Sequence, residues 1–461
     1  MTDQREFFPP PSDPMAVAAQ ILAEEHYGWR DGLRLGGTST LRYWRKCWMR
    51  WDTTRWVEVD KEIVLSELYH RLRDVYYVKV DKKGNTEEKK WEPGPSKIRG
   101  VMEATRVQTV LDSITQPPSW LDPSRSQGQI IVSCTNGLLD VASRTLADHT
   151  PVFFNEVAVP FAYDPNCPPP TEWLAFLHQV WPGDPDSIAL LQQWFGYILS
   201  GATNQQKILG IIGPTRSGKG TIGRILTGLI GEENVSALTA SGFGQHFGLQ
   251  ALVDKSVCII GDLRLRGGQH SVVERLLSIS GEDTVTTDRK GKSHWTGRVP
   301  TRVMFVSNEL PRLPDASGAV ASRCLILETT TSFLGHEDVT LTPRLLNELP
   351  GILNWSLDGL TALTRAGRFT EPQSSLDARI VLLDLASPMS AFVRDCCQRS
   401  GHVEVERLWT AWVQWCNQTG NAQGTKQKFR RDLRAVASDL TIVYPKVNGV
   451  QVRAYTPLSL I

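Results

Sequence analysis

The chain has 461 residues, of which 41% are hydrophobic and 21% charged, a composition that excludes a disordered or fibrous protein and allows about two to four domains. The net charge of +1 excludes a uniformly basic surface, so any nucleic-acid site must be a local patch. The eight cysteines lack metal-ligand spacing and are expected to be buried thiols of a reducing cytoplasm. Because no apolar run approaches a membrane span and no signal segment is recognisable, a cytoplasmic protein without membrane contact is expected.

The first part of the sequence predicts a short tail and a mixed α/β region. Residues 1–14 are polar and proline-rich and predict a flexible tail, and residues 15–200 follow as an N-terminal α/β region. Within that region the pattern predicts a hairpin over 41–56, helices over 63–75, 173–180 and 187–199, and an exposed loop in the charged stretch 79–97. Trp44, Trp48 and Trp51 could stack on bases, but we favour packing in a core.

Residues 201–370 alternate strands with helices, which predicts a mostly parallel sheet covered by helices. Its first apolar run, 208–212, leads into GPTRSGKGT and then into a helix-like run. This is the setting of a phosphate-binding loop, because Gly213 and Gly218 can turn successive N–H groups toward one anion and Lys219 adds a charge beside the β- and γ-phosphates. The predicted ATP-binding residues are Gly213, Pro214, Thr215, Arg216, Ser217, Gly218, Lys219, Gly220 and Thr221.

The magnesium ligands are predicted from two positions. Gly220 stands where a hydroxyl residue is expected, so the hydroxyl of Thr221 is the candidate Mg²⁺ contact. An ATP-hydrolysing enzyme also needs an acidic group, usually at the end of a neighbouring buried strand. Asp262 ends the apolar run 257–261 and is expected to serve the metal and the attacking water, with assistance from Glu274 or Asp283 as an open alternative.

Two further polar residues complete the predicted catalytic set. Asn308 ends the apolar run 303–307, and its amide can hydrogen-bond the γ-phosphate or the water. Arg323 directly precedes another apolar strand, 324–327, where a guanidinium could cross to the nucleotide of a neighbouring subunit. The predicted catalytic residues are therefore Lys219, Asp262, Asn308 and Arg323.

Between the strands that end in Asp262 and Asn308, the sequence SGEDTVTTDRKGKSHWTGR predicts a hairpin with arms at 285–287 and 294–296. Its tip carries Arg289, Lys290 and Lys292 around a glycine, and His294 follows. A basic tip beside an ATPase core suits the phosphates of a single DNA strand, whereas a solvated charged turn is the structural alternative.

After a predicted linker at 371–375, residues 386–461 predict three helices and a terminal hairpin, the pattern of a small winged-helix-like domain. One of these helices carries five cations, which are Lys426, Lys428, Arg430, Arg431 and Arg434.

Taken together, the stretches GPTRSGKGT, VCIIGD, SGEDTVTTDRKGK, MFVSNELP and ASRCLIL resemble a superfamily 3 helicase, and in particular the C-terminal helicase half of phage and plasmid primase-helicases related to the poxvirus helicase-primase. The resemblance covers roughly residues 40–375. It implies an AAA+-like fold, ATP with Mg²⁺, a homo-hexameric ring and movement along single-stranded or forked DNA. It also implies an arginine finger at Arg323, a sensor at Asn308 and a DNA hairpin at Lys290 and Lys292.

The sequence departs from that family at Asp262, where many members have a glutamate or paired acids, so the identity of the catalytic base stays open. Only about 40 residues precede the matching region, so primer synthesis is not predicted and a primase could be a separate chain. The leading hypothesis is a replicative DNA helicase of a mobile element. The alternatives are an ATP-dependent initiator or loader that binds DNA without strong unwinding, and a small-molecule kinase, which would not explain the basic hairpin or Asn308.

Overall fold

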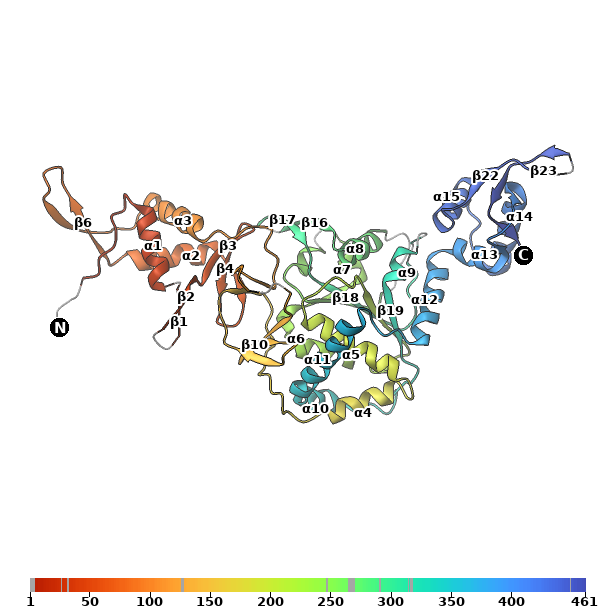
Figure 1. Cartoon of the computed structure of the whole chain (residues 1–461), viewed down its shortest axis with the longest axis horizontal. Helices are drawn as coiled ribbons and strands as arrows, with labels where there is room; N and C mark the ends of the chain where they lie inside the picture. Colours follow the sequence, from red (N-terminus) through yellow and green to blue (C-terminus); the bar gives the residue numbers. More distant parts are fainter. Residues whose placement is uncertain are drawn as a thin grey trace. The chain divides into compact units, whose positions relative to one another are not determined.

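The computed structural model describes residues 5–25, 27–30, 33–125, 128–245, 248–263, 270–289, 292–313, 315, 318–447 and 449–461 (Figure 1). The chain forms two compact units, Met1–Cys167 and Pro168–Ile461. The predicted α/β class with a parallel sheet is confirmed, because a five-stranded parallel sheet lies in the second unit. The helices predicted at 173–180 and 187–199 also lie in this unit and not, as predicted, in the N-terminal region of residues 15–200.

The first unit combines helices with small antiparallel sheets. Its elements are α1 (Pro14–Glu25), β1 (Tyr27–Arg30), β2 (Leu33–Ser39), β3 (Leu41–Trp44), β4 (Cys47–Trp51), β5 (Trp56–Val59), α2 (Lys61–Leu72), β6 (Tyr76–Val80), β7 (Thr86–Lys90), α3 (Pro95–Thr109), β8 (Ser119–Trp120), β9 (Ile131–Cys134), β10 (Gly137–Asp140), β11 (Thr145–Ala147) and β12 (Phe153–Phe154). The predicted hairpin over 41–56 is confirmed as the sheet β3-β4-β5. Trp44 and Trp48 are each 4% exposed, which confirms the core interpretation for these two side chains.

Two stretches of the first unit differ from expectation. The predicted tail is anchored beyond residue 4, because the Phe8 amide donates to the Tyr76 carbonyl at 2.8 Å and the Phe8 side chain is buried. The loop predicted at the centre of the charged stretch, residues 81–90, is instead the turn and second strand of a hairpin, since β7 pairs with β6. Its turn is closed by the Asp81 carboxylate, which accepts from the Asn85 amide at 2.9 Å. The prediction failed because β7 consists mostly of charged residues, which are more typical of an exposed loop than of a strand.

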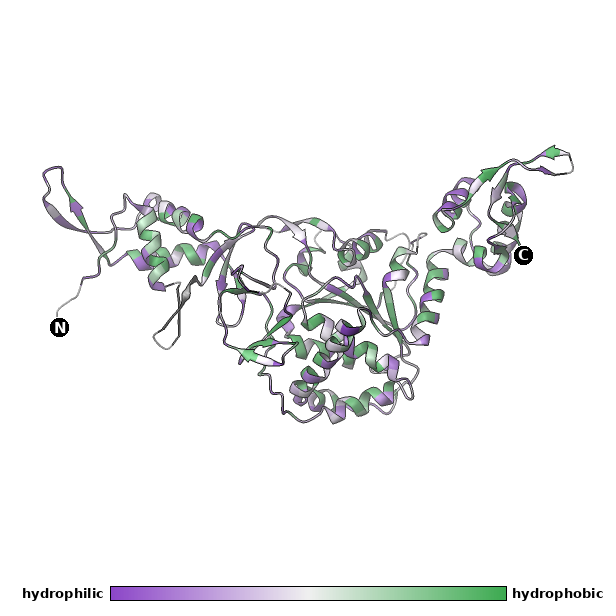
Figure 2. Ribbon diagram, viewed as in Figure 1, coloured by the Kyte–Doolittle hydropathy of each residue, from purple (hydrophilic) through white to green (hydrophobic). Residues whose placement is uncertain are grey.

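The second unit is built on the parallel sheet, with strand order β14-β15-β18-β13-β19. Its elements up to residue 386 are α4 (Thr171–Val180), α5 (Pro185–Leu199), β13 (Ile208–Ile212), α6 (Lys219–Ile230), β14 (Val235–Thr239), α7 (Ala240–Gly244), β15 (Val257–Gly261), α8 (His270–Ser280), β16 (Thr284–Arg289), β17 (Lys292–Arg298), β18 (Arg302–Ser307), α9 (Ala319–Arg323), β19 (Cys324–Glu328), α10 (Leu341–Asn347), α11 (Leu349–Ala366) and α12 (Gln373–Ala386), with short 3-10 turns at Glu232–Asn234 and Gln250–Leu252. The strands are largely green in Figure 2, as expected of a parallel sheet covered on both faces.

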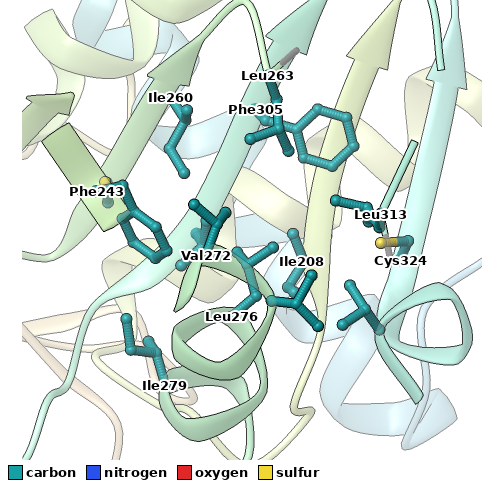
Figure 3. Packing of buried hydrophobic residues seen from close by; sticks show 14 of the residues in the cluster. Ile208, Phe243, Ile260, Leu263, Val272, Leu276, Ile279, Phe305, Leu313 and Cys324 are labelled. Carbon is teal, nitrogen blue, oxygen red and sulfur yellow. The ribbon is translucent and has the colours of Figure 1, made fainter. Parts of the chain in front are cut away.

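Alternate strand residues face opposite sides, so each face of the sheet has its own apolar layer. On one face, Ile208 and Phe305 pack against α8 through Val272 and Leu276, and α7 adds Phe243 (Figure 3). The helix α11 packs against both α5 and α6, and its contact with α5 is the more extensive. This packing fixes the strands in register, so the residues that follow their carboxyl ends meet at one edge of the sheet.

The helix α12 occupies most of the stretch where the sequence predicts a linker and the following gap. It packs along β19, the edge strand, and its buried Ser375 hydroxyl accepts from the Ile326 amide at 2.9 Å. The side chain thus satisfies a backbone donor that an edge strand leaves unpaired. Proline and serine here mark the start of a helix, with Pro372 at the N-cap position.

The last part of the chain contains the three predicted helices and a terminal hairpin. Its elements are α13 (Pro388–Cys396), β20 (Cys397–Gln398), β21 (Val403–Glu404), α14 (Val405–Thr419), α15 (Lys426–Val436), β22 (Thr441–Val443), β23 (Lys446–Val447), β24 (Val450–Gln451), β25 (Ala454–Thr456) and β26 (Ser459–Leu460). β25 lies between β21 and β22 in a three-stranded sheet, and β23 pairs with β24. Phe392, Trp412 and Phe429 join its core.

Candidate functional site

The loop over residues 213–221 begins where β13 ends, at the carboxyl edge of the sheet. Neighbouring strands β18 and β19 run parallel to β13 with Ile212 opposite Ser307 on one side and Glu328 on the other. Gly213, Arg216 and Gly218 take positive φ values of 153°, 59° and 89°, which curl the chain into a compact turn before α6 starts at Lys219. The loop therefore leads into the N-terminal end of a helix, where backbone N–H groups favour an anion.

Thr329, which directly follows the edge strand β19, supports this loop through hydrogen bonds. The Thr329 amide donates to the Ile212 carbonyl at 2.7 Å, and its hydroxyl lies 2.6 Å from the Ser217 hydroxyl. A Cβ at Gly213 would lie 2.0 Å from the Thr329 hydroxyl oxygen and 2.2 Å from its carbonyl oxygen. Glycine is thus required at 213 for close approach as well as for its backbone angle.

We expect Gly213→Ala to lower the free energy of unfolding by about 1–3 kcal/mol, because the methyl group overlaps Thr329 and strains a positive φ. The matched control is Gly223→Ala in α6, where a Cβ meets nothing within 4 Å. This control should be neutral or stabilising by up to about 1 kcal/mol. Chemical denaturation of both variants measures the difference, and equal stabilities would contradict the proposed close contact.

Lys219 is folded into the loop that precedes it. Its ammonium group donates to the carbonyls of Gly213 at 2.7 Å and Pro214 at 2.6 Å, and to the Ser217 hydroxyl at 3.1 Å. The side chain is 7% exposed, and burial lowers the pKa of its ammonium group. The cation is therefore fixed at the centre of the loop by neutral oxygen atoms, which a more strongly charged acceptor can replace.

A cavity of about 810 Å³ opens over the loop. Its walls come from four segments, which are α4, the loop with the start of α6, the end of β18, and residues 333–344. The predicted residues that line it are Thr215, Arg216, Ser217, Gly218, Lys219, Gly220, Thr221 and Asn308. The volume lies in the range of small-molecule and cofactor sites, and one end of the cavity combines a cation with helix N–H groups.

Spacing alone did not identify the residues that complete this cavity. Arg224 donates to the Thr221 hydroxyl at 3.1 Å and lies one helical turn after it. Arg344 bonds Glu172 at 2.6 Å and Asp338 at 2.9 Å, and hydrogen bonds from Thr340 and then Arg344 lower the pKa of Asp338 to about 2. Glu172 and Arg344 lie 172 positions apart, so no local pattern predicts their pairing. Only the i, i+3 spacing of Thr221 and Arg224 was visible in the sequence.

Asp262 and Asn308 follow neighbouring strands at the same edge. The Asp262 amide donates to the Val306 carbonyl at 2.7 Å, its φ is 50°, and its side chain is exposed. It lies one strand further from the loop than Asn308 and does not line the cavity. Within the described ranges, no three His, Cys, Asp or Glu side chains converge as a metal cluster. The oxygen ligands that this edge offers a hard cation such as Mg²⁺ are the Thr221 hydroxyl and, one strand beyond Asn308, the Asp262 carboxylate.

Arg323 lies at the opposite edge of the sheet. Cys324, the next residue, is opposite Ile208 at the start of β13, whereas the loop follows Ile212 at the end of that strand. The separation is about one strand of five residues, or roughly 16 Å. The Arg323 guanidinium instead donates to the Leu277 carbonyl at 2.6 Å and the Ser280 hydroxyl at 2.9 Å, both at the end of α8. It therefore does not belong to the cavity of its own chain.

The predicted hairpin is confirmed as β16 and β17, with Thr287 opposite Trp295 and Arg289 opposite Lys292. Trp295 is 6% exposed and anchors one arm in the core. His294 is exposed, and its ring nitrogen pairs with the Asp288 carboxylate. Lys290 lies outside the described residues. The hairpin thus combines the exposed His294 with the buried Trp295, and Arg289 lies opposite Lys292 in register near its tip.

Two family comparisons match separate parts of the chain. Residues 19–182 match the family described as "D5 N terminal like", and residues 211–323 match a family of unknown function, DUF5906. The second match contains the loop, Asp262, Asn308, the hairpin and Arg323. Each match covers less than half of the chain.

Solved structures share the fold. An apo structure of the NrS-1 C terminal region is 13% identical, with a TM-score of 0.55 over 96% of this chain and 98% of that one. The A form apo structure of the same region is also 13% identical, with a TM-score of 0.51 over 90% of this chain and 96% of that one. At this identity the likeness shows the fold alone. None of the helices in the described segments is both long and apolar enough to cross a membrane.

Proposed function

We propose that this chain is an ATP-dependent DNA helicase of the superfamily 3 kind, which moves along single-stranded DNA in the replication of a phage, plasmid or integrated mobile element. The observation that carries the proposal is the buried Lys219 at the centre of the 213–221 loop, beneath a cavity of about 810 Å³. The hairpin of β16 and β17, whose tip carries basic residues, lies in the same unit and supports DNA as the partner on which the ATPase acts.

The residues present fit ATP with Mg²⁺. In this proposal the loop is a P-loop whose N–H groups and Lys219 bind the β- and γ-phosphates, while Thr221 and Asp262 hold the metal directly or through water. When bound, ATP supplies the phosphoanhydride bond whose hydrolysis releases the free energy for movement. In this proposal Asn308, which lines the cavity, orients the attacking water, and Asp262, one strand further from the loop, polarises it. The segment 333–344 shields the reaction from bulk water.

Arg323 completes the proposal from another subunit. About one strand length separates it from the loop of its own chain, so in this proposal the guanidinium serves the nucleotide of a neighbour and not that of its own subunit. This is the arrangement of a ring, and a homo-hexamer is the form that the superfamily resemblance implies. The guanidinium would stabilise the negative charge that develops on the γ-phosphate.

We expect the triple change of Arg289, Lys290 and Lys292 to alanine to leave DNA-free ATPase largely intact, yet to remove DNA stimulation and unwinding. The salt dependence of single-strand binding should flatten by roughly 0.7 log units for each lost phosphate contact. Arg298→Ala is the matched control, because this exposed arginine lies at the base of the same hairpin, opposite Thr284. Strand displacement on a forked substrate is the measurement. Wild-type unwinding by the triple variant would refute the hairpin as the DNA contact.

A second candidate function is an ATP-dependent initiator or loader, and α15 is the observation that favours it. Phe429 and Leu433 are buried on one side of this helix, while five cations and a single acid make up most of the rest. In a winged-helix-like domain such a helix binds duplex DNA, with the β23–β24 hairpin as the wing. Tight duplex binding without strand displacement by the wild-type protein would support the initiator over the helicase.

A further inference from the structure

The turn between α8 and the hairpin lies at a junction of four segments. Only residues 281–283 separate Ser280, the last residue of α8, from Thr284, the first residue of β16. Within the turn, the Gly281 amide donates to the Leu277 carbonyl at 2.7 Å and the Asp283 amide to the Ser278 carbonyl at 3.0 Å. The base of the hairpin is therefore rigidly joined to the end of α8.

Arg323 packs directly on this turn. Its guanidinium donates to the Leu277 carbonyl and the Ser280 hydroxyl, and Ser280 is 8% exposed. A Cβ at Gly281 would lie 3.0 Å from Arg323 Nη1 and 2.8 Å from the Leu277 oxygen, so the absence of a side chain makes room for the arginine. The cation also compensates the partial negative charge at the C-terminal end of α8.

The same junction reaches the segment that enters β13. The Glu282 carboxylate accepts from the Thr203 hydroxyl at 2.5 Å and from the Gln206 amide at 3.4 Å. Lys207 donates to the Ser322 carbonyl at 3.2 Å, next to Arg323. Thus the end of α9, the end of α8, the start of the hairpin and the approach to the loop strand are hydrogen-bonded together at the amino edge of the sheet.

We propose that Ser280 is a positioning residue, which together with the Leu277 carbonyl holds Arg323 within its own chain and so links this arginine to the base of the DNA hairpin. The inference rests on the proposed helicase function. Two acceptors occupy both N–H groups of Nη1 of Arg323, so this nitrogen can bind a neighbouring nucleotide only when these bonds break. Their loss frees the end of α8, and DNA pulling on the hairpin in turn loosens the arginine. The linkage is reciprocal because both events share one set of bonds.

The test is the ratio of ATPase turnover with saturating single-stranded DNA to turnover without DNA. We expect Ser280→Ala to raise DNA-free turnover by about tenfold or more and to lower the ratio by the same factor, because losing a hydrogen bond to a charged group shifts such an equilibrium by at least about that much. Turnover at saturating DNA should stay near the wild-type value. Gly281→Ala, which crowds Nη1, should change the ratio in the same direction.

Ser278→Ala is the matched control, since Ser278 lies on the same helix and its hydroxyl makes no hydrogen bond among the described residues. It should retain the wild-type ratio. If Ser280→Ala and Gly281→Ala lower both turnover rates in parallel, or leave both unchanged, Ser280 has only a structural role and the inference is overturned. A wild-type protein that shows no ATPase would overturn the proposed function itself, which makes the two failures distinguishable.

Discussion

Replacing Lys219 with alanine is expected to lower ATP turnover by a factor of about 100 or more, because this change removes the cation that meets the charge developing on the phosphates. Contacts of this kind contribute about 2.7–4 kcal/mol in catalysis. The fold should persist, since the three oxygen atoms that Lys219 bonds belong to the loop itself. Steady-state ATPase assays and thermal unfolding of the same preparation check both parts of the expectation.

The matched control is Lys255→Ala. Lys255 also donates to a backbone carbonyl, that of Glu233, but it precedes β15 and does not line the cavity. Turnover by this variant should equal that of the wild type. Near-normal turnover by a folded Lys219→Ala protein would remove the basis for an ATP site at this loop.

The second large effect is expected at Arg323. Arg323→Ala should lower turnover by a factor of about 10³ to 10⁵, the range known for arginine fingers. Mixing Arg323→Ala subunits with Lys219→Ala subunits should restore part of the activity, because some interfaces then combine an intact loop with an intact arginine. The assay is ATP turnover as a function of the mixing ratio.

The control replaces the Lys219→Ala partner with subunits that carry both substitutions. Those subunits supply neither the lysine nor the arginine, so no mixing ratio should restore activity. If the first mixture also fails while mixed assemblies form, Arg323 does not act across an interface, and its bonds to α8 represent its whole function.

The parts of the site that depend on contiguous residues were predictable from the sequence. The loop needs glycines and a lysine at fixed spacing between a strand and a helix, and the hairpin needs alternating residues around a glycine. Both are local patterns, and the structure places 213–221 after β13 and pairs β16 with β17. The parallel sheet followed from the alternation of apolar runs with helices.

The rest depends on partners distant in sequence, whose meeting is decided by packing. Thr329 supports the loop from a distant part of the chain. Its hydrogen bond to Ser217 joins residues that are 112 positions apart. Arg344 meets Glu172 across 172 positions. The start of α12 was predicted as a linker for a different reason. Its first residues are proline and serine, which are typical of linkers, and the contact that stabilises them, the hydrogen bond from the Ile326 amide to the Ser375 hydroxyl, is not visible in the local sequence.

The short strand β19 connects Arg323 to the residue that supports the 213–221 loop. β19 begins directly after Arg323 and ends directly before Thr329, which holds the back of the loop. The two residues are six positions apart along an extended chain, a span of about 20 Å. Under the proposed function, β19 would set the distance between the nucleotide-binding loop of a subunit and the arginine that it offers to its neighbour. In a ring of such subunits, the length of this strand would set the distance between successive nucleotide sites. Lengthening or shortening β19 by one residue would then displace Arg323 relative to the neighbouring site at every interface.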